Sequence, residues 1–289
     1  MRVLHEAGGT ELLMMVSLKG MSCAHVAALN GHSDTLRMLH EACGKELLLM
    51  IDHSGVSCAH KAAVNGHTEA LRMLYESCGK DLLMMVTNEK GMSCAIMAAV
   101  NGHCEALRML IDAGGKELLM LVSGDAESCA HIAAMNGHVE ALRVLHEAGG
   151  TELLMMVSLK GMSCAHVAAL NGHSDTLRML HEACGKELLL MIDHSGVSCA
   201  HKAAVNGHTE ALRMLYESCG KDLLMMVTNE KGMSCAIMAA VNGHCEALRM
   251  LIDAGGKELL MLVSGDAESC AHIAAMNGHV EALRVLHEA

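Results

Sequence analysis

The chain has 289 residues and a formal net charge of −12, and 52% of its residues are hydrophobic although Trp, Phe and Pro are absent. With 19% charged residues it differs from a disordered chain, and it is long enough to bury a large core. No apolar run approaches the ~18–20 residues of a membrane-spanning helix and no signal-peptide pattern opens the chain, so we expect a soluble protein without membrane insertion. Nucleic-acid binding is not expected, because basic residues do not cluster and the only aromatics are Tyr75 and Tyr216.

Most of the sequence is one segment written twice. Residues 2–142 recur unchanged as residues 143–283, and residues 284–289 repeat residues 2–7. The odd residue is Met1, which stands where the register would place Leu142. We therefore expect residues 1–289 to form a single continuous solenoid that contains two identical units and the start of a third.

A shorter repeat divides each copy into four. The segment Ser22-Cys23-Ala24-His25 returns as Ser-Cys-Ala at intervals of 35 or 36 residues. Recurrence at this period is typical of proteins in which each unit buries its apolar face against its neighbours. We expect about eight repeats, whose first serines are Ser22, Ser57, Ser93, Ser128, Ser163, Ser198, Ser234 and Ser269.

The first predicted helix of a repeat covers residues 23–29. Ser22 is a good N-cap, because its hydroxyl can accept a hydrogen bond from a free amide of the first turn. The helix should end at Asn30-Gly31, since glycine adopts the left-handed C-terminal conformation without strain. We interpret Ser22, His25, Gly31 and His32 as structural residues of the turns, with the imidazole of His25 bonded to backbone.

The second predicted helix begins after Ser33, which is expected to be its N-cap, and ends at Gly44. Leu36 and Leu39 share one face by their i, i+3 spacing. An acidic residue in the first turn stands three positions before an arginine and can pair with it. These pairs are Asp34 and Arg37, Glu69 and Arg72, Glu105 and Arg108, and Glu140 and Arg143.

The recurring pattern G-x-S-x-A-H-x-A-A-x-x-G-H resembles the ankyrin repeat, whose signature is G-x-T-P-L-H-x-A-A-x-x-G-H, over essentially the whole chain. The resemblance implies an all-α solenoid of stacked helix–turn–helix units with projecting loops or short hairpins. It also implies non-enzymatic work, usually protein binding through the loops and the concave helix face. The sequence departs from the family in Cys23, which replaces proline, in a period of about 35 instead of 33, and in an apolar loop at residues 46–51.

The apolar loops are runs of five Leu, Met, Val or Ile residues at 12–16, 47–51, 82–86 and 118–122. They can extend the core as a helical turn or a buried strand, or they can form an apolar stripe that packs against another molecule. The candidate self-association or partner contacts are Leu12, Met14, Met15, Leu49, Met50, Met84, Met85, Met120 and Leu121.

No metal, cofactor or catalytic site is predicted. Cys23 and His25 form a recurring C-x-H pattern, but two residues apart on a helix they point to different sides. Equivalent atoms in neighbouring repeats should be about 8–10 Å apart, whereas zinc ligands lie ~2.0–2.3 Å from the metal. A disulfide between repeats is not expected either, because it needs Cα atoms within about 7 Å.

Two function hypotheses remain. The first is a structural repeat protein, a segment of an uncapped array that associates with itself end to end, and laterally, into a filament. Its terminal stacking surfaces would include Val3, Leu4, Val285 and Leu286. The alternative is an ankyrin-type scaffold or adaptor for another protein, although residues typical of binding hot spots are scarce. Unpaired cysteines and the lack of a signal peptide favour an intracellular location, with an extracellular fibre left open.

Overall fold

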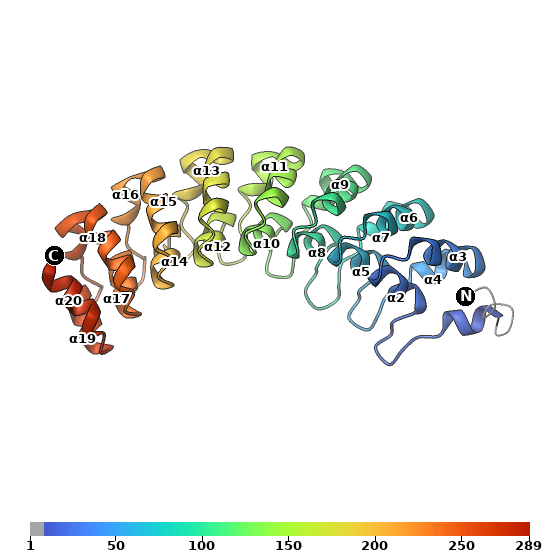
Figure 1. The fold of residues 1–289 in the computed structure, drawn as a ribbon, viewed down its shortest axis with the longest axis horizontal. Coiled ribbons are helices and arrows are strands. Elements are labelled where there is room, and N and C mark those ends of the chain that lie inside the picture. Colours follow the sequence, from blue (N-terminus) through green and yellow to red (C-terminus); the bar gives the residue numbers. More distant parts are fainter. Residues whose placement is uncertain (1–8) are drawn as a thin grey trace. The chain divides into compact units, whose positions relative to one another are not determined.

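The structure, a computed structural model, describes residues 9–289 and consists of repeated pairs of helices (Figure 1). It divides into two compact units. Unit 1 comprises Met1–Ala133 and Glu140–Leu153, and unit 2 comprises Ala134–Val139 and Leu154–Ala289. The predicted all-α repeat fold is confirmed. That residues 1–289 form one continuous solenoid with boundaries after residues 142 and 283 stays a prediction.

Every repeat opens with a helix of seven residues. These first helices are α2 (Cys23–Leu29), α5 (Cys58–Val64), α8 (Cys94–Val100), α10 (Cys129–Met135), α12 (Cys164–Leu170), α14 (Cys199–Val205), α17 (Cys235–Val241) and α19 (Cys270–Met276). They pack on one another along each unit, α2 on α5 and α5 on α8 in unit 1, and α12, α14, α17 and α19 in order in unit 2.

Within each unit the second helices form a parallel layer, in which α3 packs on α6 and α6 on α9 in unit 1, and α13, α15, α18 and α20 pack in order in unit 2. They are α3 (Ser33–Cys43), α6 (Thr68–Cys78), α9 (Cys104–Leu119), α11 (Val139–Leu154), α13 (Ser174–Leu189), α15 (Thr209–Cys219), α18 (Cys245–Leu260) and α20 (Val280–Glu288). One-turn helices follow α3, α6 and α15, namely α4 (Lys45–Leu48), α7 (Lys80–Leu83) and α16 (Lys221–Leu224). In α9, α11, α13 and α18 the same turn is joined to the second helix across a glycine kink.

The first helix is capped by an unusual reciprocal pair. The Ser57 hydroxyl accepts a hydrogen bond from the His60 backbone N–H at 3.5 Å, and the His60 Nδ1 accepts one from the Ser57 N–H at 3.2 Å. Histidine thus takes the role that Glu or Gln has in a common capping box. The following Ala62 and Ala63 are fully buried, and their small side chains allow the first helices to pack closely.

The expected N-cap of the second helix is wrong. His32 has non-helical dihedral angles of φ −81° and ψ 74°, and its carbonyl accepts the first helical hydrogen bond, from the Leu36 N–H at 3.0 Å. Ser33 is therefore already the first helical residue. The turn through Gly31, at φ +70°, sets where the chain enters the helix, and this outweighs the general preference of serine for the cap position.

The predicted acid–arginine pairs form in several repeats. Arg72 lies 3.7 Å from Glu69 and Arg143 lies 3.6 Å from Glu140. Arg108 instead reaches across to Glu147 of the next second helix, at 3.4 Å. All these side chains are largely exposed, so each pair contributes at most about 1 kcal/mol.

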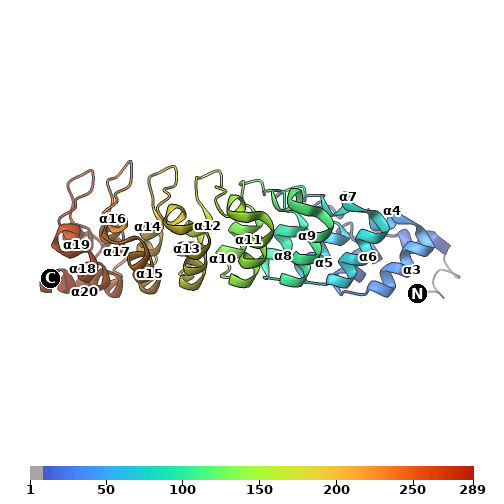
Figure 2. The same cartoon turned by 90° about the horizontal axis from the view of Figure 1, so that it is seen from above.

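Each apolar run begins as a helical turn, which resolves the two structural alternatives. Leu47 and Leu48 lie in α4 and are fully buried, whereas Leu49 and Met50 are half-buried. Ile51 then forms an isolated antiparallel bridge with Ser57, which closes the loop at its base like a hairpin, and the runs that end at Val16, Val86, Ile192 and Val227 form the same bridge. In unit 2 the loops before α14, α17 and α19 project on one side of the helix pairs (Figure 2).

The loops are held both internally and to their neighbours. Asp52 Oδ1 accepts hydrogen bonds from the backbone N–H groups of Ser54 and Val56, both at 3.0 Å. Between loops, the His53 N–H donates to the Lys19 carbonyl at 3.1 Å. The same bond, between residues 34 positions apart, recurs in later loops. Backbone hydrogen bonds therefore align successive loops. These donor and acceptor pairs are Asn88 and Ser54, Gly124 and Lys90, His194 and Lys160, Asn229 and Ser195, and Gly265 and Lys231.

Glycines of the loop and of the kink should differ in their tolerance of alanine. Gly55 and Gly79 both have positive φ. A Cβ on Gly55 would lie 2.6 Å from the Asn88 backbone nitrogen, whereas a Cβ on Gly79 would have no atom within 4 Å. We expect Gly79→Ala with Gly220→Ala to cost about 1–2 kcal/mol per site from the left-handed backbone alone. Gly55→Ala with Gly196→Ala should cost about 1–3 kcal/mol more per site, because the loops must separate.

The measurement is the midpoint of urea unfolding for the two double variants. Each double variant changes both copies of the repeat, so neither copy masks the effect. Equal midpoints for the two would show that the close contact between successive loops does not contribute to stability.

Candidate interaction surface

Buried histidines of the first helices link each repeat to the next. His60 is fully buried, and its Nε2 donates to the Met92 carbonyl of the following loop, at 3.0 Å. His25, predicted as a turn residue, makes the same bond to the Val56 carbonyl at 3.0 Å. Because Nδ1 accepts from a serine N–H and Nε2 donates, the geometry holds each ring as the neutral Nε2–H tautomer. Equivalent bonds join His166 to Val197 and His201 to Met233.

Histidines of the turn make a second link, directed to the preceding repeat. His67 Nε2 lies 3.0 Å from the Leu29 carbonyl at the end of α2. Its ring packs against Gly31, where a Cβ would lie 2.6 Å from His67 Nδ1. Glycine is required in the turn for this reason as well as for its backbone conformation. The sequence did not reveal this partner, because the bond joins residues 38 positions apart.

The Leu and Met residues selected as contacts are mostly not free surface. Met14, Leu49, Met50, Met84, Met85, Met120 and Leu121 are half-buried, and only Leu12 and Met15 are exposed. Of the proposed terminal stacking residues, Val285 is buried and Leu286 half-buried, while Val3 and Leu4 lie outside the described residues. Part of each run belongs to the core, as the first structural alternative expected.

The fifth residue of each run forms the most regular exposed apolar feature. It is always Val or Ile, and it ends the run at the base of the loop. We call the exposed members the loop row, with exposed fractions of 41% to 48%: Val16, Ile51 and Val86 in unit 1, and Val157, Ile192, Val227 and Val263 in unit 2. The recurrence of a β-branched residue at this position was visible in the sequence and could have identified the row.

Neighbouring first helices add to this surface. Lys61 of α5 forms an ion pair with Asp52 in the loop at 3.2 Å, which places the outer face of the first helix beside the loop base. Burial raises the pKa of Asp52, but hydrogen bonds from the Val56 N–H and Lys61 together lower it by more, so the pKa lies below its usual value. At the position of Lys61, α2 carries Val26, which is exposed, whereas its copy Val167 in α12 is buried. The loop row thus lies next to a lysine-bearing helix face in the repeats of α5 and α14.

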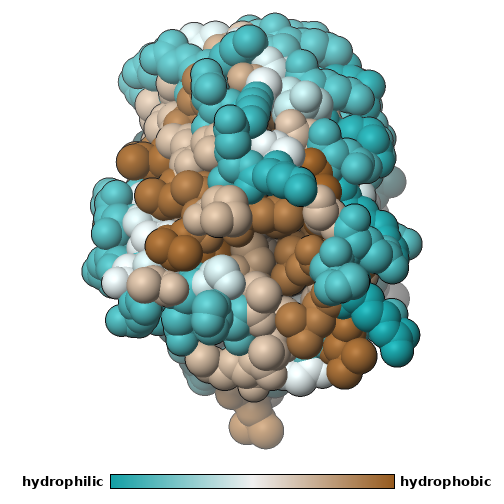
Figure 3. All heavy atoms as spheres, turned by 90° about the vertical axis from the view of Figure 1, so that its left-hand side faces the viewer, coloured by the Kyte–Doolittle hydropathy of each residue, from teal (hydrophilic) through white to brown (hydrophobic). Residues whose placement is uncertain are grey.

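A different apolar surface lies at the C-terminal end of unit 2. There Met276 of α19 and Val280 of α20 are largely exposed, and apolar side chains gather in the centre of the view (Figure 3). The repeat position occupied by His272 is exposed here but fully buried at His201, which a following repeat covers. Figure 3 therefore shows the surface that one repeat presents to the next within a stack.

Side chains that could bind a metal ion do not cluster in the part of the chain that the structure describes. Within residues 9–289, no group of three or more His, Cys, Asp or Glu side chains could hold a metal ion. No helix of the same region is long and apolar enough to cross a membrane. The fourteen cysteines are all free, and seven of them, including Cys58 and Cys94, are buried.

Two sequence profiles of ankyrin repeats match the chain. One, described as ankyrin repeats in three copies, matches residues 24–120, 96–191, 130–225 and 166–260. The other, described as ankyrin repeats in many copies, matches residues 238–287. The chain belongs to the ankyrin repeat family. No curated protein matches the chain. Ankyrin-repeat proteins are typically non-enzymatic protein–protein interaction scaffolds.

The buried histidines should make these ankyrin repeats sensitive to acid. Burial lowers the pKa of His25, His60 and His201 below the value of about 6.5 that the unfolded chain has. Protonation then favours the unfolded state, so stability should be full above pH 6.5 and fall as the pH decreases below it. We expect the urea midpoint to decrease between pH 7 and pH 5, and to decrease less in His60→Ile with His201→Ile.

Isoleucine is the matched replacement, because Ile96 occupies this position naturally and is fully buried. The control is His53→Asn with His194→Asn, which removes two exposed loop histidines and copies Asn88 of the next loop. It should keep the pH dependence of the wild type. The same loss of stability in the isoleucine variant and the wild type would contradict the assignment.

Thiol reactivity should divide the cysteines into two classes. Burial raises the pKa of Cys94 and Cys129 to about 12, so neither thiolate nor reagent access is available in the folded ankyrin repeats. Iodoacetamide at pH 8 should modify half-buried thiols such as Cys43 and Cys104 first, and the buried ones only in urea. Mass spectrometry of the native and unfolded protein measures this, and equal rates at Cys94 and Cys104 in the native protein would contradict the packing.

Proposed function

We propose that this ankyrin-repeat chain is a non-enzymatic scaffold that binds another protein through the loop row and the adjacent faces of the first helices. The family match supports protein binding as the general activity. The observation that carries the choice of surface is the recurrence of an exposed Val or Ile at the base of successive loops. Each such residue offers an apolar contact, and the repeat spacing brings several of them to one elongated partner.

The rigidity of the loops supports this surface. Five loops within residues 9–289 are closed by an antiparallel bridge, and backbone hydrogen bonds join successive loops within each unit, so the row is positioned before a partner arrives. Preorganised contacts lower the entropic cost of association. An apolar row beside Lys61 and Lys202 also gives a polar rim, which is the usual arrangement around an interface centre.

The alternative from the sequence, an interaction scaffold, is thus preferred to the filament. The family match gives no support to assembly into a filament, and the residues chosen as lateral contacts are mostly half-buried. Self-association remains a separate hypothesis. Its test is the molar mass of the purified protein by light scattering across a range of concentrations, with electron microscopy of the same samples. A constant monomer mass supports the scaffold, and filaments would reinstate the structural role.

Variants of the loop row test the scaffold. In Ile51→Thr, Val86→Thr, Ile192→Thr and Val227→Thr combined, each side chain stays β-branched but becomes polar. Because these positions are nearly half exposed, we expect little change in the urea midpoint. A protein partner captured by the wild type at fixed stoichiometry should bind the variant about tenfold more weakly or worse.

The matched control is Glu105→Gln with Glu246→Gln, which changes exposed residues in the first turn of two second helices. It should retain the partner with the affinity of the wild type. Unchanged binding by the threonine variant would place the interface elsewhere.

A further inference from the structure

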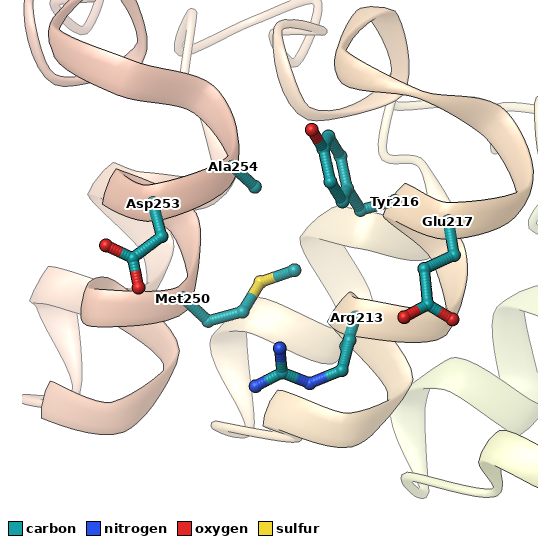
Figure 4. Close-up of a pocket in the computed structure, with 6 residues that line it drawn as sticks. All are labelled: Arg213, Tyr216, Glu217, Met250, Asp253 and Ala254. Carbon is teal, nitrogen blue, oxygen red and sulfur yellow. The ribbon is translucent and has the colours of Figure 1, made fainter.

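Grooves between successive second helices carry charged and aromatic side chains, which the loop row lacks. In unit 2 one groove is lined by Arg213, Tyr216 and Glu217 of α15 and by Met250, Asp253 and Ala254 of α18 (Figure 4). The identical groove in unit 1 is lined by Arg72, Tyr75, Glu76, Met109, Asp112 and Ala113. The chain has no aromatic residue other than these two tyrosines.

The walls of this groove are an aromatic ring and a thioether. Figure 4 shows the Tyr216 ring projecting from α15 toward α18, and the Met250 side chain extending from α18 toward α15. Ala254 is small and leaves the space beside the ring open. The groove holds about 180 Å³ in unit 2 and about 160 Å³ in unit 1. This is several times the ~30 Å³ of a liquid water but below the roughly 300–1,000 Å³ of small-ligand pockets, so the groove fits one long side chain.

The charge of the groove follows from how its arginine is paired. Arg213 pairs with Glu210 of its own helix at 3.7 Å. Glu217 and Asp253 remain as exposed carboxylates at the rim, and within residues 9–289 neither has an ion-pair partner. The groove therefore presents two negative charges beside a tyrosine ring.

The next groove along unit 1 differs from the tyrosine groove in how its arginine is paired. There Arg108 of α9 reaches across to Glu147 of α11 at 3.4 Å, so that an ion pair spans a groove of about 300 Å³. In the tyrosine groove the residue equivalent to Glu147 is Asp112, which is one methylene shorter. Arg72 turns back to Glu69 instead, at 3.7 Å, and Asp112 keeps its charge free for another molecule.

We propose that each tyrosine groove binds the side chain of a lysine or arginine from a basic segment of a partner protein. The cation lies over the tyrosine ring, where the aromatic quadrupole attracts it, and its charge pairs with the aspartate and glutamate at the rim. The methylenes of the bound side chain pack on the thioether wall. The net charge of −12 attracts such a segment at long range, and the lack of converging ligands argues against a bare metal ion as occupant. This site is separate from the loop row and does not depend on it.

The two tyrosines make the test direct, because intrinsic tyrosine fluorescence comes from these grooves alone. The probes are hexalysine with blocked ends and the same peptide with every Nζ acetylated, titrated at low ionic strength. We expect a saturable change in fluorescence with hexalysine and none with the acetylated peptide. Calorimetry should give two equivalent groove sites per chain, and Tyr75→Leu with Tyr216→Leu should weaken the binding heat.

Asp112→Asn with Asp253→Asn should raise the Kd of hexalysine about threefold or more. The control, Asp34→Asn with Asp175→Asn, removes the same number of exposed charges outside the groove and should leave the Kd nearly unchanged. Should the first variant not fold, Glu76→Gln with Glu217→Gln tests the other rim carboxylate. Equal weakening by the control, equal binding of the acetylated peptide, or an unchanged tyrosine signal would overturn the proposal.

Discussion

The structure depends on hydrogen bonds that histidines make between neighbouring repeats. One set, exemplified by His60, donates forward to a loop carbonyl, and the other, exemplified by His67, bonds backward to the last carbonyl of the preceding first helix. Each bond gives a partner to a backbone carbonyl that would otherwise lose its hydrogen bond to water when the repeats pack. An unsatisfied buried polar group costs about 1–3 kcal/mol. The glycine of the turn and the small alanines of the first helix are needed because they let the repeats approach closely enough for these bonds.

Local features of the fold were predictable from the sequence, since each depends on residues close together in the chain. The Ser-Cys-Ala-His start, the Asn-Gly end and the apolar spacing predicted the helix pairs. The cap of the second helix was mispredicted, because the turn at Gly31 determines the dihedral angles of His32 and overrides the propensity of Ser33. Partners some 35 to 40 residues apart, such as His67 and the Leu29 carbonyl, could not be read from spacing.

The candidate surfaces show the same limit. The sequence shows the recurring Val or Ile of the loop row. Only the structure shows that Leu47 and Leu48 of the same apolar run are buried, whereas the residue of the loop row is exposed. The tyrosine groove depends on whether an arginine pairs within its helix or across to the next. Arg72 pairs with Glu69 of its own helix and Arg108 with Glu147 of the next, and no local pattern records the difference. Apolar loops and acidic grooves thus give one scaffold two chemically distinct surfaces.

The replacement of histidine by Ile96, and by its copy Ile237, has a consequence for how the stack comes apart. These two helices have no imidazole to protonate, and their fully buried side chains hold the junction through apolar packing. In acid, the forward bonds of His60 and His201 are lost as the rings protonate, whereas α8 and α17 have no such bond to lose. The junction after α17 keeps the backward bond, in which His279 Nε2 lies 2.9 Å from the Val241 carbonyl. Junctions of one stack thus differ in their dependence on pH, and the difference recurs once in every four repeats.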